Sequence, residues 1–139
     1  MRYLCLAYYD EAKMKALPKS ELHAIVSKCP GYDAQLRNTG HLLFSASLGG
    51  PGTTISIRPK DNKIAITDGP FTESKEMIGG LFIIEAASAE EAKSIASNHP
   101  AAHLGEQIGW GIEVRPIDRF LEFPRRLAAT ERGWLSRWP

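Results

Sequence analysis

The stretch LFIIEAASAEEA, residues 81–92, passes from a strand pattern to a helix pattern within a few positions. Its first half, Leu81 to Ala86, is apolar on both alternating faces, which is typical of a strand buried on two sides. Ser88 and Glu91 then form an S-x-x-E capping box, the signature of a helix N-terminus. The helix that follows has an apolar face, made by Ala92, Ile95 and Ala96. A buried strand followed directly by an amphipathic helix indicates a fold of mixed helices and strands.

Further strands and one more helix flank this stretch. Residues 2–9 are again apolar on both faces. Apolar side chains recur at helical steps from residue 22 to 36 and stop before Gly40, and Pro30 predicts a kink or two abutting helical pieces. The remaining strands are predicted at residues 42–48, 53–58, 64–66 and 110–116, with a hairpin turn at 60–63 and a loop or short helix at 67–80. This order predicts an α+β fold with a ferredoxin-like sheet and both helices on one face.

One layer of helices covers only one side of such a sheet. Two of the predicted strands, residues 2–9 and 81–86, are nevertheless apolar on both faces. Stacking the sheets of two copies would cover the second face. We therefore expect a homodimer that forms an α+β barrel, and the alternative is a monomer with a moderately apolar outer face.

The composition is that of one globular domain. The chain has 139 residues, 43% of them hydrophobic and 24% charged, and a formal net charge of +1. A charge so close to zero disfavours nucleic-acid binding over the whole body. No segment approaches the roughly 20 apolar residues that span a bilayer, and the short apolar run at the N-terminus is interpreted as a strand and not a signal peptide. Cys5 and Cys29 are predicted to be free thiols. Because neither a signal peptide nor a membrane span is predicted either, we expect a cytoplasmic protein that does not engage membranes.

The most distinctive motif is TDGPFTESKE, residues 67–76, followed by Gly79-Gly80. Together with RYL at residues 2–4 and EVRPI at residues 113–117, it closely resembles the DGPF branch of the YCII-related family. The resemblance covers residues 1–118 and leaves residues 119–139 as a separate tail. It implies a dimeric α+β barrel of ferredoxin-like subunits in the bacterial cytosol. Some relatives are encoded beside sigma factors of the extracytoplasmic-function type, and a few act on small molecules such as chlorinated aromatics.

In the YCII branch a His-Asp pair associated with the first helix has been proposed as catalytic. This chain offers His23 and Asp33 in that region. Pro30 and Gly31 interrupt the helical pattern between them, so the two side chains need not face each other. We do not transfer the catalytic role to this pair.

Asp68 is the candidate catalytic residue. A carboxylate at the end of a strand that faces a cleft acts as a general base or orients a ligand, whereas in a simple turn it accepts backbone N–H groups. Glu73 and Lys75 follow on a short charged turn. Lys75 is a candidate for holding an anionic ligand and Glu73 for fixing the loop, and the alternative is that both are merely solvated.

Glu113 and Arg115 share one face of the last predicted strand, opposite Ile112 and Val114. If the apolar pair packs on the helices, the charged pair faces the dimer interior and forms a wall of a polar cavity. Arg115 is then the better anion ligand because its planar fork matches a carboxylate or phosphate. The alternative is an ion pair at the exposed rim.

Neither a metal nor a cofactor is predicted. His99 and His103 are four residues apart, but Pro100 spoils the helical geometry that would align them as ligands. The tail, residues 119–139, mixes arginines with aromatic residues and is expected to form a short amphipathic helix or to pack on a partner subunit. Nucleic-acid binding by this tail is the weaker interpretation, because it also contains Glu122 and Glu131.

These observations predict a dimeric protein that binds a small anionic organic molecule in a cleft, with its reaction class, if any, left open. The alternative function is a non-catalytic regulatory or interaction module linked to sigma-factor signalling. An enzyme needs a wet pocket with converging polar groups, whereas a scaffold can fill the same space with apolar side chains.

Overall fold

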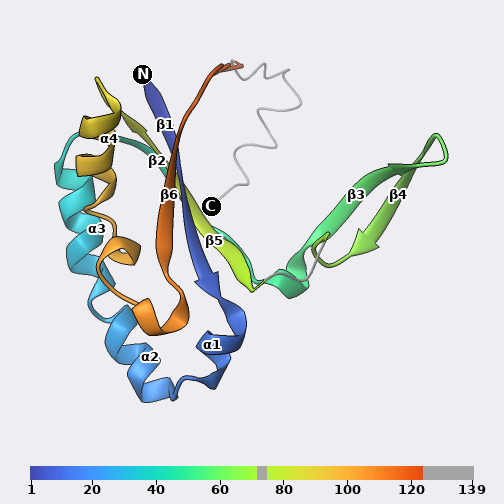
Figure 1. Cartoon of the computed structure of the whole chain (residues 1–139), viewed down its shortest axis with the longest axis horizontal. Coiled ribbons are helices and arrows are strands. Elements are labelled where there is room, and N and C mark those ends of the chain that lie inside the picture. The colour runs from blue at the N-terminus through green and yellow to red at the C-terminus, as the bar shows by residue number, and fades with distance from the viewer. Residues whose placement is uncertain (72–74, 124–139) are drawn as a thin grey trace, which may run out of the picture.

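The computed structural model describes residues 1–71 and 75–123. It has a mixed α+β architecture in which helices cover one face of a four-stranded antiparallel sheet (Figure 1). The strands are β1 Arg2–Asp10, β2 Leu42–Ser47, β3 Ile55–Lys60, β4 Lys63–Asp68, β5 Glu76–Glu85 and β6 Gly111–Pro116. The helices are α1 Glu11–Ala16, α2 Lys19–Val26, α3 Cys29–Asn38 and α4 Ala89–Ala96.

The main sheet has the strand order β2-β5-β1-β6, and every neighbouring pair is antiparallel. When β3 and β4 are set aside, this is the ferredoxin-like arrangement that the sequence predicts. The strands β1 and β5, which are apolar on both faces in the sequence, occupy the two central positions. Central strands are paired on both edges and form the middle of the core, so this placement explains their composition.

The core lies between the main sheet and the helices. Alternate residues of the two central strands point toward the helices and are buried. Ser88 caps α4 by accepting a hydrogen bond from the backbone N–H of Glu91 at 3.1 Å, as the capping box predicts. The buried cluster consists of Tyr3, Cys5, Leu36, Phe82, Ile84, Ala86, Ala92, Ile95 and Ala96.

The first helical stripe is divided into α2 and α3, so the prediction of two abutting pieces is confirmed. The break falls at Ser27 and Lys28, and Pro30 lies in the first turn of α3, where its missing N–H costs no helical hydrogen bond. Gly40 follows α3 with φ +76°, a backbone conformation that favours glycine.

Strands β3 and β4 form a separate hairpin, here called the arm, that projects from the end of the main sheet on the side away from the helices (Figure 1). Asp61 and Asn62 have positive φ and form its two-residue turn, with Lys60 paired to Lys63. At the base of the arm, the Arg58 guanidinium lies 3.9 Å from the centroid of the Phe71 ring.

The sequence-based prediction for residues 67–80 was wrong at both ends. The strand β4 continues to Asp68, and β5 already begins at Glu76 instead of Leu81. The extension is possible because the β1–β5 register shifts opposite Ala7 and Tyr8, where Gly79 and Gly80 lie in β5. Among the helices that the structure describes, none is long and apolar enough to span a bilayer.

Candidate functional site

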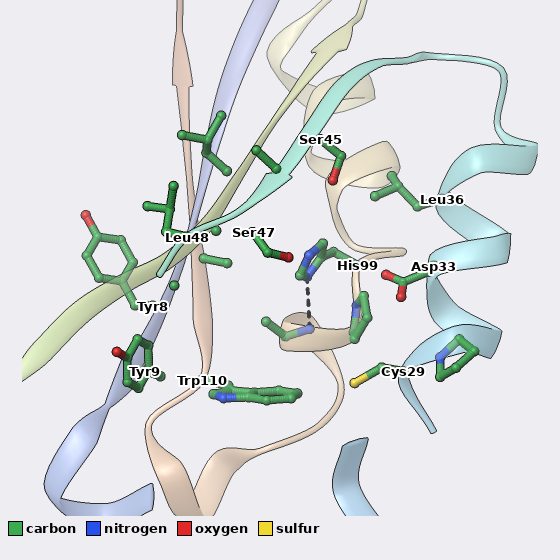
Figure 2. A pocket seen from close by; sticks show the side chains of 18 of the residues that line it. Tyr8, Tyr9, Cys29, Asp33, Leu36, Ser45, Ser47, Leu48, His99 and Trp110 are labelled. Carbon is green, nitrogen blue, oxygen red and sulfur yellow. Dashed lines mark hydrogen bonds between the residues drawn. The ribbon is translucent and has the colours of Figure 1, made fainter. Parts of the chain in front are cut away.

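A cavity of about 620 Å³ opens between α3, β2 and the loop after α4 (Figure 2). It is partly open to solvent, and its volume falls in the range of pockets that hold small organic molecules. Apolar and aromatic side chains make most of the wall, and polar groups enter from three different elements. Its apolar and aromatic lining residues include Tyr9, Leu36, Leu48 and Trp110, and its polar lining residues include Cys29, Asp33, Arg37, Ser45, Ser47 and His99.

Glycines give the aromatic side chains of this cavity their positions. A Cβ on Gly79 would lie 2.9 Å from the Tyr9 ring, and a Cβ on Gly105 would lie 2.5 Å from the Trp110 ring. Both distances are far below van der Waals contact, so the two rings occupy space that only glycine leaves free. Gly79, in the glycine pair that follows the DGPF motif, therefore contributes to the shape of the cavity, as does Gly105.

His99 is held in a defined orientation by its neighbours. Its Nδ1 accepts a hydrogen bond from the backbone N–H of Ala101 at 3.0 Å, which caps the 3₁₀ turn at Pro100–Ala102. The imidazole also stacks on Phe82, with ring centroids 4.8 Å apart and planes inclined by 2°. Because Nδ1 is an acceptor in this arrangement, the proton of the neutral ring lies on Nε2.

The electrostatic environment keeps His99 neutral. Burial lowers the pKa of His99 below its ordinary value of 6.5, while the negative charge of Asp33 acts in the opposite direction. Protonation would also place a hydrogen on Nδ1, where it would face the N–H of Ala101. His99 is therefore suited to donate a hydrogen bond from Nε2 and poorly suited to act as a general base.

Asp33 is the acidic group of the cavity. It lies on α3, is exposed to solvent, and faces the loop that carries His99 (Figure 2). Burial and the charge of Asp33 together raise the pKa of the Cys29 thiol, so this cysteine remains protonated and is not an activated nucleophile. The site thus combines a neutral N–H donor with a carboxylate acceptor beside aromatic walls.

The predicted residues that the structure describes lie outside this cavity, on the arm, at its base and on β6. Asp68 ends β4 in the arm and is exposed, and Lys75 borders a second hollow between the base of the arm and α1. Glu113 and Arg115 lie on β6, on the sheet face opposite the helices, where they pair with Leu6 and Leu4. Glu73 lies outside the described residues. The catalytic role of Asp68 and the ligand-binding roles of the other four residues stay predictions.

The strand register agrees with the prediction that Ile112 and the pair Glu113 and Arg115 lie on opposite faces of β6. Ile112 packs against the core on the helix side, while Val114 is largely exposed because β6 is an edge strand. On the opposite face, the hydroxyl of Tyr8 donates a hydrogen bond to Glu113, and this bond, followed by burial, raises the pKa of Tyr8.

Sequence reasoning missed His99 because it considered this histidine only as a metal ligand paired with His103. The available signal was its position directly before Pro100, since a side-chain acceptor followed by proline is typical of a cap. His103 differs from it, because it stacks on Tyr32 and its Nε2 contacts the carbonyl of Ser97. In the described part of the chain, no three His, Cys, Asp or Glu side chains gather as metal ligands.

Known proteins that are similar to this chain match it over most of its length. An uncharacterised protein of Rhizobium meliloti is 28% identical over 117 residues, which is 84% of this chain and 92% of that protein. A solved structure of 5-chloro-2-hydroxyhydroquinone dehydrochlorinase from Burkholderia phenoliruptrix, in complex with 2,5-dihydroxybenzoquinone, is similar with a TM-score of 0.42 and 19% identity. That similarity covers 86% of this chain and 96% of the enzyme. The model of the YCII-related domain matches residues 1–120, and the chain therefore belongs to the YCII-related family.

Proposed function

We propose that the chain binds a small, planar organic molecule in the cavity between α3 and β2. The observation that carries this proposal is the convergence of His99 and Asp33 on one cavity with aromatic walls. Tyr9 and Trp110 supply flat apolar surfaces, while the two polar groups come from α3 and from the loop after α4. A largely apolar pocket with a few polar groups of fixed direction is the usual form of a small-molecule site.

The two polar groups differ in what they offer a ligand. His99 donates from Nε2 to a ligand oxygen, and Asp33 accepts a hydrogen bond or a proton from a ligand hydroxyl group. Arg37, one turn after Asp33 on α3, also lines the cavity and offers a positive charge to an anionic substituent. The ligand that fits this set is an anionic aromatic or enolic molecule that carries a hydroxyl group.

The finer assignments from the sequence belong to the same proposal. The DGPF motif supports the DGPF branch of the family, and free Cys5 and Cys29 support a reducing, cytoplasmic environment. A dimeric α+β barrel is supported by the apolar sheet face opposite the helices, which we call the outer face. It carries Leu4, Leu6, Phe44, Leu81 and Ile83.

An interaction module of the kind linked to sigma-factor signalling is the second candidate function. The observation that favours it is one face of the arm, here called the isoleucine face, which is formed by the exposed side chains of Ile55, Ile57, Ile64 and Ile66. An exposed apolar surface is typical of a site that contacts another protein. The two functions predict different behaviour of the cavity. Only the first requires it to bind an organic ligand.

Calorimetric titration with 2-hydroxybenzoate, benzoate and cyclohexanecarboxylate tests the ligand class. We expect the hydroxylated aromatic acid to bind most tightly and the non-aromatic acid to bind least. His99→Asn keeps an acceptor near the Nδ1 position and removes the Nε2 donor, so it should weaken 2-hydroxybenzoate binding about tenfold, the scale of one hydrogen bond. His99→Gln, which keeps a donor near Nε2, should restore part of this loss.

The same substitution at two aspartates separates the two candidate sites. Asp33→Asn should weaken binding of 2-hydroxybenzoate relative to benzoate, because only the former offers a hydroxyl group. If Asp68→Asn has this effect and Asp33→Asn does not, the site lies at the DGPF segment, as the sequence predicts. Failure of all three acids to bind would favour the interaction module.

A further inference from the structure

Two serines of β2 lie on the side of the main sheet that faces the helices. Ser45 pairs directly with Phe82 of β5, whose side chain is buried against the helices, and Ser47 lies two residues further along the same face. Both residues line the cavity (Figure 2). A strand face that is covered by helices is normally apolar, and Leu42 at the start of β2 follows this rule by packing on the core. The two serines depart from the rule where the strand borders the cavity.

The hydroxyl groups of these two serines are free to bind a ligand. Neither has a hydrogen-bond partner within residues 1–71 and 75–123. By contrast, the hydroxyl of Ser97 donates to the carbonyl of Lys93 at 2.6 Å, as is common for serine in proteins. Strand stability does not explain the choice of serine either, because valine or threonine suits a strand better.

The serines lie beside the histidine that donates into the cavity. His99 stacks on Phe82. The strand register makes Phe82 the direct partner of Ser45 and a diagonal neighbour of Ser47, and such neighbours lie about 5–8 Å apart. Figure 2 shows the Ser47 hydroxyl group directed toward the His99 ring. Because Nε2 of His99 carries a hydrogen, three neutral donors face the same part of the cavity.

The charged groups near these donors limit the charge of the ligand. Asp33 and Arg37 are four residues apart on α3 and both line the cavity. Within the described residues neither forms an ion pair, and their two charges sum to zero. A phosphate dianion requires more positive charge than this. A carboxylate is a monoanion, and its two oxygens accept hydrogen bonds from several donors.

We propose that Ser45 and Ser47 bind the carboxylate group of the ligand, together with Nε2 of His99. This inference rests on the proposed function and refines it, because it names the ligand group that is recognised and the strand that recognises it. The carboxylate lies against β2 beside Phe82. The ring of the ligand extends from there toward the end of the cavity where Trp110 lies (Figure 2).

Calorimetric titration with benzoate and nitrobenzene tests the proposal. The two molecules have the same planar shape, but nitrobenzene is uncharged and accepts hydrogen bonds only weakly. Ser45→Ala/Ser47→Ala should weaken benzoate binding at least ~30-fold, the scale of two hydrogen bonds. Nitrobenzene should bind the wild type and this variant alike. A damaged cavity would instead weaken the binding of both molecules.

The matched control is Ser20→Ala/Ser94→Ala, which removes two exposed hydroxyl groups from α2 and α4, outside the cavity. It should leave benzoate affinity unchanged, and circular dichroism of both variants establishes that the fold is intact. If the wild type binds benzoate and Ser45→Ala/Ser47→Ala binds it equally well, this inference fails and the proposed function stands. Equal losses for benzoate and nitrobenzene would also overturn it. A wild-type chain that does not bind benzoate would overturn it together with the proposed function.

Discussion

The main sheet and the arm contain similar residues, but these residues are buried in the main sheet and exposed in the arm. Ile84 in β5 is completely buried, whereas Ile64 in β4 is 74% exposed, although both lie in antiparallel strands rich in β-branched residues. In the main sheet α4 and α3 cover one face, and in the arm no described element covers the isoleucine face. Sequence alternation therefore specifies which side chains share a face, but the surrounding elements decide whether that face is buried.

Removing the same atoms from the two regions gives the largest expected contrast. Ile84→Ala should lower the free energy of unfolding by about 2–5 kcal/mol, because it leaves a cavity in the core. Ile64→Ala should cost less than ~0.5 kcal/mol within a single chain, since its side chain is solvated there. Urea denaturation at low protein concentration measures both. Equal losses for the two variants would show that the arm is packed within its own chain.

Two glycines with positive φ provide a second contrast. Gly105 has φ +75° and a Cβ there would meet the Trp110 ring, while Gly69 has φ +92° and open space around it. Gly69→Ala should cost about 1–2 kcal/mol from backbone conformation alone. Gly105→Ala should cost more than Gly69→Ala and should also weaken ligand binding, because Trp110 must move. Thermal unfolding together with calorimetric titration tests this, and unchanged ligand affinity in Gly105→Ala would separate Trp110 from the site.

A smaller effect concerns pH. Because burial lowers the pKa of His99 in the folded chain, the unfolded chain binds more protons at mildly acidic pH. The stability contributed by neutral His99 is present above the ordinary histidine pKa of about 6.5 and is lost as pH falls through the lower, folded-state value. His99→Asn should reduce the slope of unfolding free energy against pH in this window. His23→Asn, on the exposed surface of α2, is the comparison variant, and identical slopes for wild type and His99→Asn would contradict the assignment.

Much of the fold follows from local signals in the sequence. The capping box at Ser88, the helix end before Gly40 and the hairpin turn at Asp61-Asn62 each depend on residues close in the chain, and each occurs where the pattern predicts it. The early start of β5 was missed because Gly79 and Gly80 resemble a turn. In the structure they permit a register shift within a continuous strand.

The cavity was harder to predict because its parts are distant in the sequence. Asp33 comes from α3, Ser45 and Ser47 come from β2, and His99 follows α4. No spacing rule connects them, since tertiary packing alone brings them together. The sequence-based prediction selected Asp68 because of the DGPF motif. In the structure, the carbonyl of the neighbouring Gly69 accepts a hydrogen bond from the hydroxyl of buried Ser56, and its N–H donates one to the carbonyl of Thr54 at the base of the arm. Those contacts give Gly69 a structural role at the base of the arm, beside the turn role that the sequence offers as the alternative for Asp68.

The site of insertion of the arm bears on how this protein could change over evolution. The strand β2 ends at Ser47 and β5 continues past Gly80, its direct partner, so the two strands already lie together as a hairpin would. The backbone N–H of Leu48 even donates to the carbonyl of Gly79 at 3.0 Å, just before the chain departs into the arm. The arm, residues 55–68, is an excursion from a main sheet whose four strands pair without it. The arm can therefore lengthen, shorten or acquire new side chains while the cavity keeps its geometry, so the two parts of this small domain can change independently.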